Sequence, residues 1–158
     1  MPMQPLVQTA VSSSFRIDDV YVNVWTSMPG LEQLKAVADG ERAMPVGYRS
    51  LEIILRMDRM RFESGVREAF SKQAAEFAGK PVKNIMVSRA GGFGGSVIHG
   101  LVGILNTVGL KTPLFVDVDA GIAALLEGAR PPSPAPELLR ILVDQLIAEH
   151  TLRVPPPR

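Results

Sequence analysis

The sequence predicts an α/β domain in which helices flank a mostly parallel sheet of four or five strands, with an extra helix at the C-terminus. Short apolar or β-branched runs alternate with turns and with stretches of helical period, and this alternation repeats four times along the chain. Strands that alternate with helices are typical of βαβ units. The predicted strands are the runs 20–25, 51–55, 82–87 and 113–116.

Length and composition support a single globular domain. The 158 residues suit one domain and can bury a substantial core. A hydrophobic fraction of 46% with a charged fraction of 21% is typical of a globular protein. We expect the domain to cover residues 1–129, followed by a proline-rich linker over 130–136, a helix over 137–150 and a tail over 151–158.

Charge and cysteine content argue against several classes of function. A net charge of +1 gives no field that would attract nucleic acid or an anionic membrane. The chain has no cysteine and only two histidines, which argues against disulfides and against Cys- or His-rich metal sites. The N-terminus lacks the pattern of a signal peptide, and no apolar run reaches the roughly 20 residues of a membrane span. We therefore expect a cytoplasmic protein without metal, cofactor, nucleic-acid partner or membrane partner.

The first third of the chain contains two predicted strands and one helix. Alternating side chains suggest an edge strand over 6–15, and residues 16–19 read as a turn. The strand 20–25 has bulky side chains on both faces, so we expect helices to cover it on both sides. Residues 27–30 resemble a helix start, with Ser27 as the capping residue.

The middle of the chain contains the clearest helix. It is predicted to begin near Arg59, where an apolar stripe starts, and to end at 79–81. Glu63 and Arg67 lie four residues apart and can pair on its charged side. After the strand 82–87, a glycine-rich turn over 90–95 precedes a helix that we expect Ser96 to open and Gly109 to close.

The last third ends in a strongly apolar helix. Asp117 or Asp119 is expected to cap a short helix after the strand 113–116. The terminal helix is apolar over more than half of its circumference, so it must be covered. It can dock on its own domain or pair with a second copy of the chain.

Neither His99 nor His150 has a nucleophile or carboxylate nearby in sequence, so we expect both to be structural.

The order of elements over residues 6–126 resembles the STAS fold of anti-sigma-factor antagonists and their SpoIIAA-like relatives. The likeness rests on three segments: residues 20–34, residues 51–65 and the closing strand with its helix, residues 114–126. The resemblance implies a bacterial regulatory protein that acts in signalling by docking to a partner. In the family, a segment similar to 51–65 holds a phosphorylated Asp-Ser-Ser/Thr-Gly motif. Here Phe62-Glu63-Ser64-Gly65 has one hydroxyl residue instead of two, and glutamate in place of aspartate.

Ser64 is accordingly the candidate phosphoacceptor. A phosphate near a helix start would gain from the local N–H groups and would add about two negative charges. The alternative is an ordinary polar residue in an amphipathic helix. The residues expected to contact a partner protein are Phe62, Glu63, Arg67, Gly92, Phe93 and Gly94.

The glycine-rich turn 91–95 allows a different function. Bare amides at the start of a helix can bind an anion, so a nucleotide-like small molecule is the alternative ligand, for a binding protein or a small enzyme. The segment matches neither the P-loop nor the GxGxxG pattern. We predict a non-enzymatic interaction module, with possible self-association through the C-terminal helix, ahead of this alternative.

Overall fold

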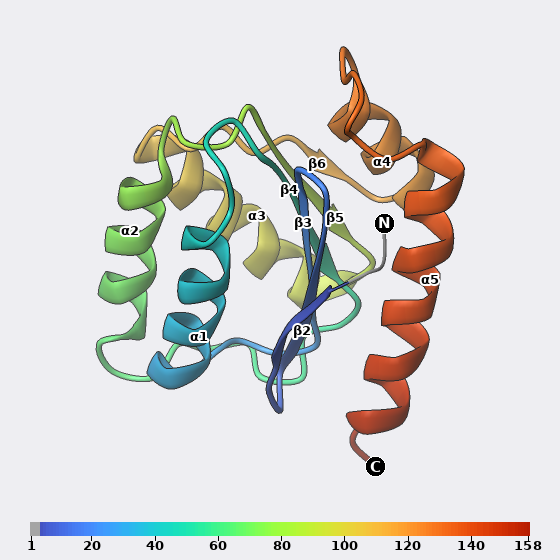
Figure 1. Cartoon of the computed structure of the whole chain (residues 1–158). Coiled ribbons are helices and arrows are strands. Elements are labelled where there is room, and N and C mark those ends of the chain that lie inside the picture. Colours follow the sequence, from blue (N-terminus) through green and yellow to red (C-terminus); the bar gives the residue numbers. More distant parts are fainter. Residues whose placement is uncertain (1–3) are drawn as a thin grey trace.

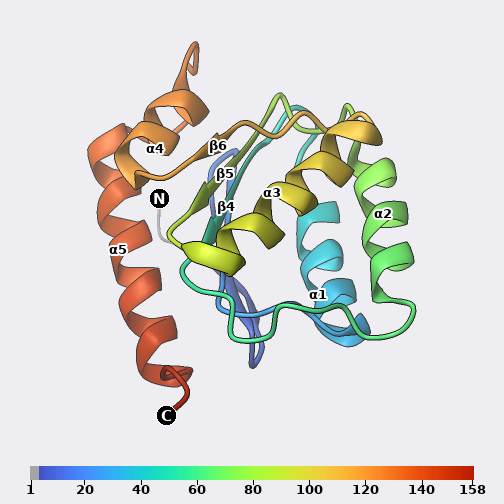
Figure 2. The same cartoon turned by 180° about the vertical axis from the view of Figure 1, so that it is seen from behind.

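The computed structural model describes residues 4–158, and the side chains of all of these except residues 4, 5 and 93. Within this range the chain forms one six-stranded sheet, whose strands lie in chain order, between two layers of helix (Figures 1 and 2). The strands are β1 (Gln4–Gln8), β2 (Ser12–Ile17), β3 (Val20–Trp25), β4 (Arg49–Ile54), β5 (Lys83–Ser88) and β6 (Leu114–Phe115). The first three pair in antiparallel fashion, whereas β3 to β6 are parallel. The predicted α/β class is confirmed, with one or two strands more than expected.

Three helices cover one face of the sheet and two cover the other. The crossover helices α1 (Leu31–Arg42), α2 (Val66–Phe77) and α3 (Gly92–Thr107) lie together on one face, as right-handed connections between successive parallel strands require (Figure 1). Helices α4 (Val118–Leu126) and α5 (Pro136–Arg153) cover the opposite face. None of the described helices combines the length and the apolar character needed to cross a bilayer.

Each face of the sheet has its own apolar core because successive side chains of a strand point to opposite faces. Val20, Val22 and Val24 pack toward α4 and α5, whereas Tyr21 and Trp25 pack toward α1 to α3. Every residue of β3 is buried, which confirms that this strand is covered on both sides.

The terminal helix docks on its own sheet. Leu139, Val143 and Leu146 of α5 belong to the same buried cluster as the inner side chains of β2 and β3. The helix spans residues 136–153, four residues longer than the predicted 137–150, because its last turn contacts the β1–β2 hairpin. Leu138, Ile141 and Leu152 remain exposed, and self-association through this helix stays a prediction.

The predicted edge strand is wrong in detail, because the chain forms two strands there. Thr9 turns the chain: its hydroxyl accepts hydrogen bonds from the amides of Val11 and Ser12, and its own amide bonds the carbonyl of Ser12 at 2.8 Å. The serines after this turn are buried and form β2. The strand then continues through Ile17, so the predicted turn 16–19 narrows to its last two residues.

Three predicted helix starts are also displaced. Helix α1 is capped by Gly30, whose amide bonds the Gln33 side chain at 2.6 Å, and not by Ser27. Helix α2 begins at Val66 and not near Arg59. Helix α3 begins at Gly92 and not at Ser96, so most of the predicted glycine turn is its first turn. The predicted ends of α2 and α3 and the cap of α4 by Asp117 are confirmed.

The late start of α2 has a tertiary cause. Residues 56–65 are held as a loop by backbone bonds to the segment after β3, from Asp58 N to Thr26 O and from Met28 N to Arg59 O, both 2.9 Å long. Gly65 then adopts a left-handed conformation (φ 81°) directly before the helix. Amphipathic spacing alone could not reveal these bonds.

The contact of α4 with the sheet depends on the absence of a side chain at Gly121. A Cβ atom at this position would lie well inside van der Waals contact with Val87 of β5. We expect Gly121→Ala to lower the free energy of unfolding by about 1–3 kcal/mol through overpacking. Gly100→Ala in α3, where a Cβ would meet nothing within 4 Å, is the matched control and should raise it by about 0.5–1 kcal/mol. Urea unfolding of both variants tests this, and equal effects of the two substitutions would contradict the close packing.

Candidate functional site

A cavity of about 110 Å³ lies between the sheet and helices α1, α2 and α3. For comparison, an apolar cavity of about 150 Å³ is large enough to bind benzene. The space is smaller than this but of the same order, about that of a single six-membered ring. Most of the wall is apolar and includes Trp25, Leu34, Phe62, Phe70, Phe77 and Leu101.

The cavity runs along the sheet and reaches the carboxyl ends of β3 and β4, the edge at which α/β sheets commonly bind ligands. Met57 and Phe62, from the loop after β4, belong to its wall and are only partly buried. Phe62 packs on Phe70 of α2, with ring centroids 5.6 Å apart. The loop 56–65 thus connects the cavity to the protein surface.

Glu52 lies in the polar part of the cavity wall, on the central strand β4. It pairs in register with Asn23 of β3 and Met86 of β5, and it shares the face of Ile54, which packs toward the three crossover helices. Its Oε2 atom accepts hydrogen bonds from Trp25 Nε1 at 2.5 Å and from Asn23 Nδ2 at 3.2 Å. Among the described side chains, none donates a hydrogen bond to the other carboxyl oxygen, Oε1.

The environment of Glu52 favours its neutral form. Burial of the carboxyl group, together with the nearby charge of Glu41, raises its pKa from 4.5 to about 8, although the bonds from Trp25 and Asn23 act in the opposite direction. A glutamic acid with this pKa holds a proton at neutral pH. It can donate that proton to a ligand, or lose it when a cation enters.

A second carboxyl group lines the same cavity from α1. Glu41 is 9% exposed, and it accepts a hydrogen bond from the Tyr48 hydroxyl at 2.5 Å. Burial raises the pKa of Glu41 to about 7. No lysine, arginine or histidine is among the described residues that line the cavity, so its two acids have no cationic partner there.

Asn84 of β5 adds a further acceptor to the wall. Its Nδ2 atom donates to Thr112 Oγ1 at 2.8 Å, and that hydroxyl in turn donates to the carbonyl of Leu110. Because Thr112 uses its only proton in this way, it must accept from Asn84, which fixes the orientation of the amide. Within the described part of the chain, no group donates to Asn84 Oδ1.

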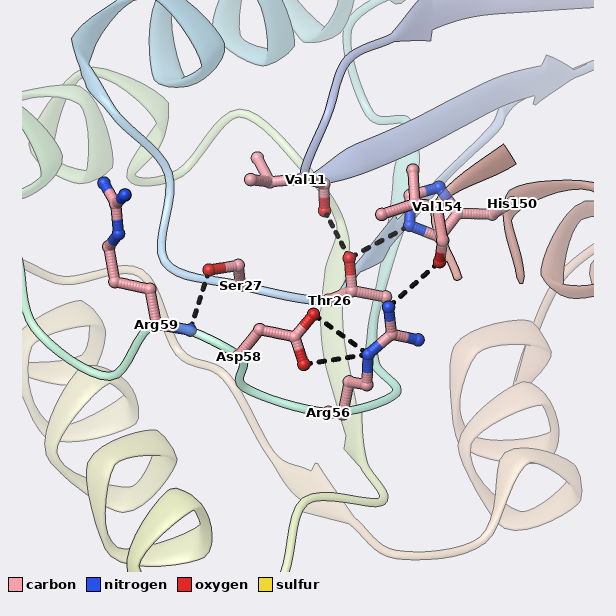
Figure 3. A network of polar contacts seen from close by, with 8 residues as sticks. All are labelled: Val11, Thr26, Ser27, Arg56, Asp58, Arg59, His150 and Val154. Atoms are coloured by element: carbon pink, nitrogen blue, oxygen red, sulfur yellow. Dashed lines mark hydrogen bonds and ion pairs between the residues drawn. The ribbon is translucent and has the colours of Figure 1, made fainter. Parts of the chain in front are cut away.

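A separate polar network lies at the end of β3 and joins it to α5 (Figure 3). His150 is 1% exposed; its Nε2 atom lies 3.1 Å from Thr26 Oγ1, and its Nδ1 atom lies 2.7 Å from Ser13 Oγ. Arg56 bonds both Asp58 and the carbonyl of Val154. Burial and the charges of Arg153 and Arg56 lower the pKa of His150 to about 4, so the ring is neutral. The predicted structural role of His150 follows from this buried position.

The predicted phosphoacceptor and its neighbours lie on the surface. Ser64 is exposed and directly precedes Gly65, the residue that caps α2. Glu63 forms an ion pair with Arg59. The expected pairing of Glu63 with exposed Arg67 is wrong, because Glu63 lies in the loop and not in the helix.

The structure brings the two predicted contact regions together. Gly94 of α3 is buried against the 56–65 loop, and a Cβ atom there would lie 3.6 Å from the Cβ of Met57. Gly92 is exposed, with φ 59°. The side chain of Phe93 lies outside the described residues, so its predicted contact with a partner stays a prediction.

The sequence reasoning missed both cavity acids. The available signal was Glu52 itself, a single charge inside the apolar run 51–55. Such a residue in a central strand must be paired, protonated or functional, because an isolated buried carboxylate is costly. Glu41 gave no comparable signal, because charged residues are common on helices.

Comparisons with known proteins do not identify the chain. No family model, no curated protein and no solved structure matches it significantly. The STAS-like assignment therefore stays a prediction from the sequence.

The raised pKa of Glu52 predicts how stability depends on pH. The unfolded chain loses this proton near pH 4.5 and the folded chain near pH 8, so stability is fully present below 4.5 and is lost as pH rises to 8. At about 1.4 kcal/mol per pH unit, we expect the loss due to this group to be roughly 4–5 kcal/mol. Glu52→Gln, which cannot ionise, should therefore gain stability relative to the unsubstituted protein between pH 5 and pH 8.5.

Chemical denaturation of the two proteins at a series of pH values measures this gain. Comparison at each pH removes the contribution of His150, whose lowered pKa makes stability fall as pH falls from 6.5 to 4. A stability difference that is constant across the range would show that Glu52 has an ordinary pKa.

Proposed function

We propose that this chain is a binding domain for a small, mostly apolar molecule that is neutral or positively charged. The observation that carries the proposal is the cavity itself, which is apolar and about the size of one ring. Its wall includes two carboxyl groups, and none of the described lining residues has a cationic side chain. An anion would meet Glu41 and Glu52 without a compensating charge. Apolar ligands with a few polar contacts are the usual occupants of such cavities.

Toluene and benzyl alcohol are suitable test ligands because both are uncharged and carry a single ring. At about 100 times its dissociation constant, a bound ligand raises the free energy of unfolding by about 2.7 kcal/mol, which thermal unfolding detects readily. We expect both compounds to stabilise the protein.

Two alanines on neighbouring positions of α2 provide a matched pair of variants. Ala74 lines the cavity and is 5% exposed, whereas Ala75 is exposed. Ala74→Leu should fill the space and abolish stabilisation by the ligands, and Ala75→Leu should leave it unchanged. Ala38→Val fills the cavity from α1 and provides a second test if Ala74→Leu fails to fold. Equal stabilisation of all the variants would place the ligands elsewhere and reject the proposal.

We infer a second role, docking to a partner protein, for the surface formed by residues 59–67. Its support is the exposure of Met60, Ser64 and Arg67. Met60 and Ser64 lie on the 56–65 loop, which hydrogen bonds connect to the β3–α1 segment, and Arg67 lies in the first turn of α2. A phosphate on Ser64 would lie next to the amino-terminal end of α2, where the helix dipole favours negative charge. A STAS-like regulatory module would use its phosphorylated segment in this way. The nucleotide-like anion at 91–95 stays the alternative from the sequence.

Intact-mass measurement of the chain from its native cell tests the phosphorylation. We expect a fraction carrying one phosphate, which Ser64→Ala removes and Ser71→Ala, within α2, retains. A pull-down with the same protein should recover a partner that charge reversal at Arg67 releases. A phosphate that persists in Ser64→Ala would exclude Ser64 as the acceptor.

A further inference from the structure

We propose that the natural ligand of the cavity is an organic amine, whose ammonium group pairs with Glu52 while its apolar body fills the ring-sized space. This inference rests on the proposed function and specifies the chemical class of the ligand. It depends on which hydrogen-bonding atoms and charges the wall presents.

The described wall of the cavity offers both donors and acceptors, and its acceptors include the oxygens of two carboxyl groups. Trp25 Nε1 and Asn84 Nδ2 of the wall, and Tyr48 Oη behind Glu41, each donate to a protein acceptor. The amide of Gln73 and the hydroxyl of Ser27, also in the wall, donate no bond among the described contacts. Among the described contacts, no group donates to Glu52 Oε1, Glu41 Oε2 or Asn84 Oδ1. An ammonium group carries two or three N–H donors and no acceptor, so it complements this set of oxygens.

Charge favours the same class of ligand. Burial disfavours the ionised form of both carboxyl groups, and the charge of Glu41 adds to the cost of ionising Glu52. An ammonium group allows Glu52 to ionise and supplies the positive charge that its surroundings lack. A neutral alcohol or ketone would use only one hydrogen bond of the protonated acid, and a carboxylate would find no positive charge among the described lining residues.

The elements packed around Glu52 contribute few titratable side chains to its surroundings. Helix α1 contributes Glu41, and β3 contributes Tyr21, whose pKa burial raises well above its ordinary value, so that it stays neutral. Tyr48, bonded to Glu41, stays neutral for the same reason. The described lining residues of α2, α3 and β5 include no titratable side chain. Arg42 and Lys80 lie on the ring of Phe77, with their charges 5.8 and 5.5 Å from its centroid, and are not part of the lining.

Three ligands of nearly equal size separate the possibilities: benzylamine, benzyl alcohol and benzoate. Isothermal titration calorimetry of the whole chain at pH 7 should show benzylamine binding roughly tenfold or more tightly than benzyl alcohol, and no binding of benzoate. Benzylamine should release close to one proton, seen as a dependence of the heat on the ionisation enthalpy of the buffer. Its affinity should rise about tenfold per pH unit between pH 6 and 7, because the acid must ionise to hold it.

Substitutions at two glutamates test whether Glu52 is the group that pairs with the ammonium. Glu52→Gln should weaken benzylamine binding roughly tenfold to 100-fold and abolish the proton release, while benzyl alcohol still binds. The continued binding of benzyl alcohol shows that the variant is folded. Glu68→Gln, on the exposed side of α2, makes the same substitution outside the cavity and should change nothing.

The outcomes distinguish this inference from the function on which it rests. If benzyl alcohol binds as tightly as benzylamine, or if Glu52→Gln leaves benzylamine binding intact, the amine assignment is wrong and the apolar binding site stands. If none of the three ligands binds, or if benzoate binds best, both are wrong.

Discussion

The candidate site depends on how the central strand β4 accommodates the side chain of Glu52. Glu52 occupies the middle of β4, on the face that α1, α2 and α3 cover, and is partly buried there. Two donors, from Trp25 and Asn23 of the adjacent strand, hold one of its oxygens. The second oxygen has no described donor, and the apolar side chains around it leave a cavity. An acid in this position is costly to retain for stability alone, which is the physical reason for assigning it a function.

The two faces of the sheet differ in the side chains that pack on them. On the α4–α5 face, valines, isoleucines and leucines form one buried cluster, and the neutral His150 joins the end of α5 to Ser13 and Thr26. The opposite face combines aromatic side chains with acids and encloses the candidate site. Phe62 belongs both to the cavity wall and to the loop that carries Ser64.

The sequence predicts the elements whose signals are local. The runs 20–25 and 51–55 are strands because apolar and β-branched residues dominate them, and Asp117 caps α4 through its own side chain. The start of α2 could not be predicted, since backbone bonds from the β3–α1 segment hold residues 56–60 outside the helix. The cavity could not be predicted from the sequence either. Its wall brings together side chains of α1 and β4, and the spacing of residues along the chain does not show how these two elements pack. Only the isolated charge of Glu52 marked the site in advance.

The ionisation state of Glu52 is the most direct measure of this account. The carboxyl carbon of Glu52 can be followed by ¹³C NMR across a pH titration and assigned by its absence from Glu52→Gln. The account predicts that this resonance titrates with a midpoint at about 8 in the free protein, as burial in the cavity requires. A midpoint near the ordinary value of 4.5 would show that the carboxylate is solvated and would contradict the site as described.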